Sequence, residues 1–352
     1  MEMKDMKFRI GIIGAGGIAR YAHIPGWKKL ADAEVIAVAD PSRQALKIAQ
    51  DEFAVPFVYT DYRKMLERKD IDIIDICAPN SVHFPATIAA LQSGRHVICE
   101  KPIAVSSKEV EEMHRTAKRC RKKLMAAQSH RFRPESEITK SLISKGVFGE
   151  IYFAQCHALR RRLLPINPTF IRKELSGGGP LLDIGVHILD LSYWFLGCPK
   201  VHSVSGVTFT KLARRKDVAG LWGEWDRDAY DVEDFAAGFV RFKDGRSLTL
   251  ACSFLANMEK QEDFSVQLFG TEAGMHWPTF KLFMERNRIL EDVELNIPQQ
   301  ETEPPHYKEL RVFLECVKEN KEVPVRVEES IEVIRMLEGI YRSAETNQEV
   351  VF

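Results

Sequence analysis

Two side chains that could exchange protons with a substrate lie in one apolar stretch, residues 176–197 (SGGGPLLDIGVHILDLSYWFLG). Asp183 and His187 are spaced as neighbours on one face of a helix, and imidazole titrates near neutral pH. The other positions are apolar on almost every side, which predicts a buried helix that begins near Pro180. Burying a carboxylate and an imidazole is costly unless each has a partner. The pair is therefore either a structural hydrogen bond in a core or an acid–base pair beneath a cleft.

A glycine-rich turn follows the first predicted strand. Residues 14–19 (GAGGIA) match the pattern G-x-G-x-x-G/A, and Asp40 closes the second predicted strand about 20 residues further on. Such glycines permit a tight turn and let backbone N–H groups meet a pyrophosphate. The Asp40 carboxylate would accept hydrogen bonds from ribose hydroxyls and repel a 2′-phosphate, while Arg43 either lies over the adenine or is solvated. The pattern predicts dinucleotide binding by Gly14, Gly16, Gly17, Ile18, Asp40 and Arg43.

Two further strand ends carry polar residues. Pro79 and Asn80 follow one predicted strand, with His83 soon after, and Glu100 and Lys101 close another. Ligands bind at the carboxyl ends of the strands in open α/β sheets. Each segment is also typical of an ordinary loop between a strand and a helix.

The elements that must position these residues alternate between strands and helices in the first part of the chain. This alternation predicts a parallel, doubly wound α/β sheet with helices on both faces. Pro25 is expected to end or kink the first helix. The predicted strands are 8–13, 34–39, 57–59, 71–77, 97–99 and 124–127, and the predicted helices are 18–30, 42–53, 62–68, 83–92 and 108–123.

The second part of the chain changes to a period of two. Asp244-Gly245 is a hairpin signal, and residues 211–231 form a long loop that is either a lid or a partner contact. The residues 163–176 are expected to be a loop, and 297–305 a linker. The predicted strands are 151–162, 201–209, 235–242, 247–254 and 264–269, and the predicted helices are 135–145, 307–319 and 328–346.

Composition limits the class of protein. The 352 residues favour two domains, and the balance of 50 basic and 50 acidic residues leaves no global field that would recruit nucleic acid or a membrane surface. The start of the chain has no apolar leader segment, and no stretch is apolar enough to span a membrane. The seven cysteines are dispersed without a C-x-x-C pair, so we expect reduced thiols, a cytoplasmic location and no metal site.

Four segments together resemble the Gfo/Idh/MocA family, the glucose–fructose oxidoreductase and inositol dehydrogenase group. They are the glycine turn 14–19, CAPNSVH at 77–83, GRHVICEKPIA at 94–104 and GGGPLLDIGVH at 177–187. The resemblance covers nearly the whole chain. It implies a Rossmann domain at residues 1–129 and, at 130–352, a substrate-binding and oligomerisation domain of the α+β class with a large, open, mainly antiparallel sheet.

The resemblance also implies a set of functional residues. Lys101, Asp183 and His187 would form the catalytic set and contact the substrate, and Arg131 would lie near the cofactor and substrate. Pro79, Asn80, His83, Glu100 and Lys101 join the glycine-turn residues as candidate cofactor contacts. His157, on the predicted strand 151–162, is a further candidate substrate contact. Arg160 and Arg162 share a face of that strand and either reach an acidic substrate group or are solvated or in a subunit contact.

The expected function is hydride transfer between NAD, with NADP possible, and a secondary alcohol of a sugar, inositol or related polyol. His187 would act as base and Lys101 would stabilise the developing alkoxide. Two alternatives remain within the family: a glycosidase that uses bound NAD in a transient redox cycle, and a non-catalytic dinucleotide-binding regulator. The sequence leaves the substrate and the physiological direction open.

The strands of the second domain also predict a homodimer or homotetramer. Phe235 and Phe239 are expected to lie with Leu248 and Leu250 on a strongly apolar face beneath the domain's helices. The opposite face is expected to carry small, uncharged residues, which suit the packing of one sheet on a second copy. These residues are Ala236, Gly238, Val240, Thr249, Ala251, Ser253, Ser265 and Gln267. Cover by the protein's own loop 211–231 is the alternative.

Overall fold

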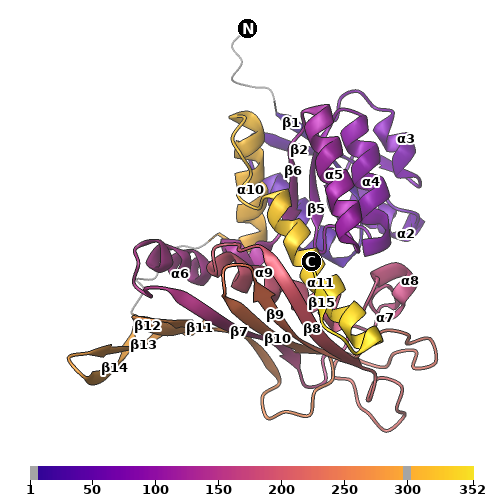
Figure 1. The fold of residues 1–352 in the computed structure, drawn as a ribbon. Helices are drawn as coiled ribbons and strands as arrows, with labels where there is room; N and C mark the ends of the chain where they lie inside the picture. Colours follow the sequence, from indigo (N-terminus) through magenta and orange to yellow (C-terminus); the bar gives the residue numbers. More distant parts are fainter. Residues whose placement is uncertain (1–6, 296–302) are drawn as a thin grey trace. The chain divides into compact units, whose positions relative to one another are not determined.

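The computed structural model describes residues 7–295 and 303–352, and its contacts divide the chain into two compact units (Figure 1). The first unit comprises Met1–Phe132 and Glu303–Ile331, and the second comprises Arg133–Thr302 and Glu332–Phe352. The sequence predicted an unbroken second domain, so the return of 303–331 to the first unit is a difference. Its cause is α10 (Pro305–Lys318), which packs against α1 (Ile24–Lys29).

The first unit is built on a six-stranded sheet in the order β3-β2-β1-β4-β5-β6, and every pair in it is parallel. This confirms the predicted doubly wound sheet. The strand order reverses between β1 and β4, and open α/β sheets bind their ligands at the carboxyl ends of such strands. The strands are β1 (Phe8–Ile13), β2 (Ala33–Ala39), β3 (Phe57–Tyr59), β4 (Ile73–Ile76), β5 (His96–Glu100) and β6 (Leu124–Ala127).

The first helix differs from its prediction. It starts as a π-helix, η1 (Ala19–His23), and continues directly as α1. Pro25 was expected to end or kink this helix, but it lies in the first turn of α1, where proline is accommodated because its missing N–H is not needed. The other helical segments of this unit are α2 (Arg43–Asp51), α3 (Tyr62–Leu66), α4 (Asn80–Gln92), α5 (Ser107–Cys120) and η2 (Ser129–Phe132).

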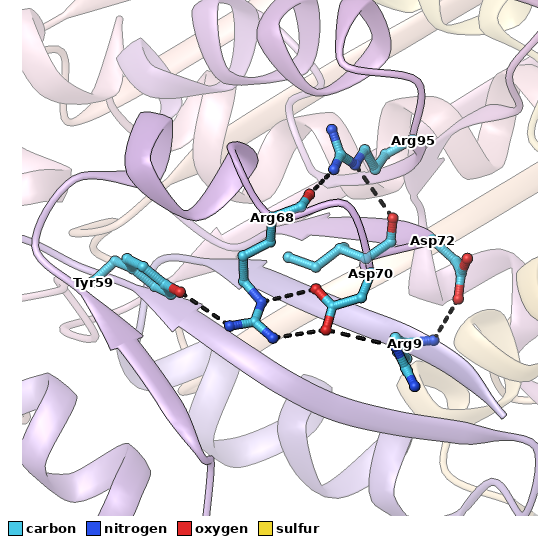
Figure 2. A network of polar contacts seen from close by, with 7 residues as sticks. Arg9, Tyr59, Arg68, Asp70, Asp72 and Arg95 are labelled. Atoms are coloured by element: carbon cyan, nitrogen blue, oxygen red, sulfur yellow. Dashed lines mark hydrogen bonds and ion pairs between the residues drawn. The ribbon is translucent and has the colours of Figure 1, made fainter.

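A charged network fixes the amino ends of the parallel strands (Figure 2). The Arg68 guanidinium donates to both carboxylate oxygens of Asp70, at 2.9 and 2.7 Å, and Arg9 lies 3.6 Å from the same carboxylate. The Arg9 backbone N–H donates to Asp72 at 2.8 Å, and Arg95 donates to backbone carbonyls of the same loop. These contacts lie at the amino ends of the strands, opposite the carboxyl ends where a ligand is predicted to bind, so we interpret them as structural.

The second unit is built on a nine-stranded sheet in the order β14-β13-β12-β11-β7-β10-β9-β8-β15. Every pair in it is antiparallel except β7 with β10, which confirms the predicted mainly antiparallel sheet. Strands β12 to β15 were not predicted. The strands are β7 (Ile151–Arg160), β8 (Val201–Phe209), β9 (Phe235–Phe242), β10 (Ser247–Ser253), β11 (Glu262–Gly270), β12 (Ala273–Trp277), β13 (Lys281–Arg286), β14 (Ile289–Glu294) and β15 (Val350–Val351).

Helices cover one face of this sheet. The π-helix η3 (Leu181–Gly185) and α9 (Val186–Phe195) pack on β7, β10 and β11, and α6 (Pro134–Ser144) packs on β12. Two short helices, α7 (Pro168–Ile171) and α8 (Lys173–Ser176), lie in the segment expected to be a loop. Part of the predicted linker 297–305 lies outside the described residues. Among the described residues, every helix is too short or too polar to cross a membrane.

The faces of β9 are the reverse of those predicted. Leu250 pairs with Gly238, and Thr249 pairs with Phe239, so Phe239 lies on the open face and Gly238 on the helix-covered face. The reason is close packing by α11 (Val327–Thr346): a Cβ at Gly238 would lie 2.5 Å from the Ile340 side chain. Phe235 and Phe239 are therefore half-exposed residues of the open face.

Candidate active site

The glycine turn after β1 provides open space beside its backbone. Gly14 has φ +98°, and a Cβ there would lie 2.6 Å from the Cys77 carbonyl carbon, so this glycine permits close contact with the segment that follows β4. A Cβ at Gly16 or Gly17 would meet no atom within 4 Å. The turn therefore leaves room for a ligand at the start of η1, as a bound pyrophosphate requires.

Asp40 is held against this turn. One carboxylate oxygen accepts the Ala15 N–H at 2.8 Å, and the other accepts the Ser42 N–H at 2.8 Å. Arg43, at the start of α2, lines an open hollow of 480 Å³ together with Lys47 and Lys64. Asp40 directly follows β2, and the hollow is lined by residues of α2, β3 and α3 together with Asp61. The adenosine end of a dinucleotide binds near the end of the second strand in this fold.

His83 connects the two other predicted strand ends. Its ring nitrogens lie 2.7 Å from the Pro102 carbonyl oxygen and 2.8 Å from the Ala78 carbonyl oxygen, and burial lowers its pKa. Pro79 immediately precedes α4, and Asn80 is its first residue. The loops after β4 and β5 are therefore fixed to each other by a buried imidazole.

Lys101 follows β5 and is half-buried, whereas Glu100 is buried. The Lys101 backbone N–H donates to the Glu100 carboxylate at 3.0 Å. Burial opposes ionisation of Glu100, but the hydrogen bond from His23 and the charges of His23 and Lys101 outweigh it and lower the pKa of Glu100 to about 2. An ionised Glu100 therefore lies directly beside the candidate catalytic lysine.

Asp183 and His187 lie on η3 and α9, so the predicted α-helix begins with a π-helical turn. Both side chains are half-buried, while Leu182 and Ile184 beside them are buried. The face that Asp183 and His187 share is therefore the more accessible side of this segment. π-helical turns are rare and occur frequently at functional sites.

The start of η3 is fixed by a buried carboxylate. Glu233 accepts the N–H groups of Gly179 at 2.9 Å and Leu181 at 3.0 Å, and the Tyr341 hydroxyl at 3.0 Å. Burial raises the pKa of Glu233 even though these hydrogen bonds oppose the shift. A Cβ at Gly178 would clash with Tyr341, and one at Gly179 with the Glu233 carbonyl. Here the glycines make room for the protein's own groups.

Three arginines that the sequence suggested as possible cofactor or substrate contacts bind other groups of the protein instead. Arg131 is buried and forms an ion pair with Glu329 at 2.5 Å within the first unit. Arg160 pairs with Glu262 at 2.8 Å, and Arg162 donates to backbone carbonyls after β10 and to a nearby asparagine. Their guanidinium groups are used within the fold.

His157 lies on the open face of the sheet, because it pairs with Ala251 and Ser265. The segment η3 packs on the opposite face, where a Cβ at Gly185 would lie 3.2 Å from the Cys252 sulfur. The structure therefore separates His157 from Asp183 and His187. The alternation of β7 placed His157 on the face that the helices leave open.

The sequence did not identify the buried residues that hydrogen-bond to the segments carrying the candidate site residues. Glu233 and Tyr341 are far from residues 179–181 in the chain, and only the fold brings them together. His23 and Glu309 are likewise distant from Glu100. Asp75 is the exception. Its carboxylate lies in the middle of the buried strand β4, and a buried carboxylate must have polar partners, so the local sequence indicates that such partners exist.

The fold and this geometry define a dinucleotide-binding α/β protein with a second, sheet-based unit. Residues 8–128 match the GFO/IDH/MocA oxidoreductase family with an NAD-binding Rossmann fold, and residues 137–276 match the GFO/IDH/MocA C-terminal domain. The chain belongs to the Gfo/Idh/MocA family of NAD-binding oxidoreductases.

Two curated relatives are sugar dehydrogenases by name. The D-glucoside 3-dehydrogenase of Escherichia coli is 33% identical over 99% of this chain and 98% of its own length. The levoglucosan dehydrogenase of Pseudarthrobacter phenanthrenivorans is 30% identical over 67% of this chain and 65% of its own length. The first similarity spans both units.

Solved structures show the same fold over nearly the whole chain. Levoglucosan dehydrogenase in complex with NADH aligns with a TM-score of 0.84 at 21% identity, over 98% of this chain and 99% of the other. The aldose–aldose oxidoreductase of Caulobacter crescentus, complexed with glycerol, aligns with a TM-score of 0.80 at 22% identity, over 98% of this chain and 100% of the other.

Proposed function

We propose that this chain is an NAD-dependent dehydrogenase that oxidises a secondary alcohol of a sugar, inositol or related polyol, or reduces the corresponding ketone. The main support is the full-length similarity to a D-glucoside 3-dehydrogenase. Lys101, Asp183 and His187 are all present at the positions that the family motifs assign to the catalytic set. Turnover of a panel of sugars and inositols with both nicotinamide cofactors tests the proposal.

The bound nicotinamide supplies the hydride acceptor, and the chain's residues supply the rest. In this proposal His187 takes the hydroxyl proton, because imidazole can accept a proton near neutral pH. The Lys101 ammonium stabilises the negative charge that develops on the alcohol oxygen. Asp183, one turn before His187, orients the imidazole or binds a second hydroxyl of the substrate.

We assign cofactor binding to the glycine turn and the adjoining strand ends. Gly16, Gly17 and Ile18 would receive the pyrophosphate, and Asp40 the adenosine ribose. Pro79, Asn80, Glu100 and Lys101 would line the nicotinamide end, with His83 holding their loops together. Arg43 would lie beside the adenine. Asp40 favours NAD over NADP because its charge repels a 2′-phosphate.

We propose self-association through the open face of the nine-stranded sheet. Its central strands carry half-exposed Phe153, Phe235 and Phe239 beside Thr249 and Ala251, which is more apolar than a solvent-facing sheet. An isologous contact of this face with a second copy gives a dimer, and two dimers give a tetramer. We also propose a cytoplasmic location, because all seven cysteines are free thiols.

A further inference from the structure

A group of charged side chains is buried next to Lys101 in the first unit. His23, the last residue of η1, has no solvent exposure. Its Nδ1 lies 2.8 Å from the Asp75 carboxylate, and its Nε2 lies 2.8 Å from the Glu100 carboxylate. The Trp27 indole N–H also donates to Asp75, at 2.7 Å. The second oxygen of Glu100 accepts the Lys101 N–H, so a chain of hydrogen bonds runs from Asp75 to the backbone of Lys101.

The two carboxylate contacts indicate that His23 is protonated on both nitrogens. A neutral imidazole has one N–H donor and one lone pair, whereas both nitrogens of His23 face carboxylates, which accept hydrogen bonds when ionised. Only the doubly protonated ring satisfies both contacts while Asp75 and Glu100 remain ionised. Burial disfavours this cation, but the charge of Asp75 and its hydrogen bond raise the pKa of His23 well above its usual value.

The other groups around this cluster leave the balance of charge intact. Glu309 of α10 is completely buried, and neither of its carboxylate oxygens has a hydrogen-bond partner. Burial raises the pKa of Glu309 well above its usual value, which favours the neutral carboxyl. Burial likewise raises the pKa of Cys77 and lowers the pKa of His306, which favours the uncharged form of both groups. The charged groups that remain are Asp75, His23, Glu100 and Lys101.

We propose that His23 is a positioning residue for Lys101, held protonated between Asp75 and Glu100 so that Glu100 stays ionised against the Lys101 backbone. The inference rests on the proposed function only in assigning catalysis to Lys101. Two anions and two cations alternate along the row, so the two buried carboxylates are balanced by the buried His23 and the half-buried Lys101. Without the His23 cation, Glu100 would be a buried carboxylate with a single cationic neighbour, and it would take up a proton near neutral pH.

The protonation of His23 is measurable without turnover. In the full-length protein labelled at the histidine ring nitrogens, we expect the His23 imidazole to carry protons on both nitrogens at about pH 8, well above the usual histidine pKa of about 6.5. The signal is assigned by its absence from His23→Gln. A neutral His23 ring at this pH would overturn the inference, whether or not any sugar is oxidised.

Kinetics test the effect on Lys101. We expect His23→Gln to lower kcat about 10²-fold near pH 7, because a small displacement of a catalytic group has an effect of this size, while the Kd for NAD changes less than about twofold. The deficit should shrink as the pH rises and Glu100 ionises, so the ratio of variant to wild-type kcat should increase between about pH 6 and about pH 9. Loss of a purely structural contact would lower kcat by the same factor at every pH.

His96→Gln is the matched control. His96 begins the same strand, β5, at the end opposite Glu100, and its Nδ1 accepts the Lys123 N–H at 3.0 Å. We expect its kcat and pH profile to match the wild type. If His23→Gln turns over as fast as the wild type, or with a deficit independent of pH, the positioning role is wrong. Wild-type protein that oxidises no sugar would contradict the proposed function alone, and the ring measurement would still decide the charge of His23.

Discussion

The chemistry proposed for this protein depends on two basic side chains, Lys101 and His187. We expect Lys101→Ala and His187→Ala each to lower kcat about 10²- to 10⁴-fold, the usual contribution of a positioned acid or base. The Kd for NADH, measured by fluorescence titration, should change little. Lys108→Ala and His202→Ala are the matched controls, because both residues are exposed, on α5 and β8. Near-normal kcat of His187→Ala on the true substrate would show that another group is the base.

The proposed preference for NAD over NADP depends on a single carboxylate. Asp40 is fixed by two backbone N–H groups, so its charge stays near the ribose position. We expect wild-type protein to bind NADH more tightly than NADPH, and Asp40→Ser to bind NADPH better than the wild type does because the repulsion is removed and Arg43 remains. Dissociation constants for both cofactors measure this. Tighter binding of NADPH by the wild type would show that the basic hollow determines the choice.

Glu309 makes stability depend on pH. Its pKa is raised in the folded state, so the folded protein retains a proton that the unfolded chain releases above about pH 4.3. The wild type therefore loses about 1.4 kcal/mol of stability per pH unit between the unfolded and folded pKa values. Glu309→Gln is always neutral and lacks this loss. We expect the Tm of the variant minus that of the wild type to increase from about pH 5 to about pH 8. A difference in Tm that does not change with pH would show that Glu309 is ionised in the folded protein.

At the scale of single residues, the sequence predicted those residues whose role depends only on a ligand or on near neighbours in the chain. The glycine turn, Asp40 and the Asp183–His187 spacing could be read because their partners are a ligand or near neighbours in the chain. His23, Glu100 and Glu309 could not be read as one group, because three distant segments contribute them. The separation of His157 from Asp183 could not be predicted either, because the face that a strand residue occupies depends on which face the helices cover.

At the scale of the elements, the segment η3–α9 depends on its close contact with Glu233 and Tyr341. A Cβ at Gly178 would clash with the Tyr341 hydroxyl and lie 2.8 Å from its Cζ. We expect Gly178→Ala to destabilise the fold by about 1–3 kcal/mol, the usual cost of overpacking, and to lower the Tm.

Two further variants make this test specific. Tyr341→Phe removes the clashing hydroxyl, so the double variant with Gly178→Ala should recover part of the loss, which a double-mutant cycle of Tm values can measure. Lys173→Ala, at an exposed position of α8, should leave the Tm unchanged. Equal Tm values for Gly178→Ala and the wild type would contradict the packing described.

Most strands and helices were predictable because each has a clear period, and the errors have physical causes. The faces of β9 were misassigned because the sequence favoured the aromatic residues as core, whereas Gly206 and Gly238 admit Ile340 of α11. Strands β13 and β14 are largely exposed and lack the alternation that indicates a half-buried strand. The π-helical turns at η1 and η3 have no signal in an apolar periodicity.

At the scale of the whole molecule, the open face of the second sheet predicts self-association. We expect Thr249→Glu combined with Ala251→Glu to dissociate the oligomer, because both residues lie on this face and two added charges per subunit would meet their copies in a buried contact. Light scattering after size exclusion gives the mass. The control is Ser141→Glu with Ser144→Glu, at exposed positions of α6. A wild-type monomer at micromolar concentration would exclude the assembly.

The division into units was only partly predictable. The change of period near residue 130 indicated where the first sheet ends, and the contacts place the boundary at Phe132. The return of α10 to the first unit could not be predicted, because an amphipathic helix shows that it packs on something but not on what. Its contacts with α1, η1 and η2 bring Glu309 into the buried group around His23.

The central claim is that this protein transfers a hydride between a carbohydrate hydroxyl and a nicotinamide cofactor. The most direct measurement incubates the wild type with glucosides, free sugars, inositols and their keto forms, with NAD or NADP, and follows NAD(P)H at about 340 nm together with the carbohydrate products. We predict NADH formation in equal amount to a keto product with at least one substrate, and its abolition in Lys101→Ala. Cofactor binding without turnover of any substrate would contradict this account, and so would release of free sugar without net NADH formation.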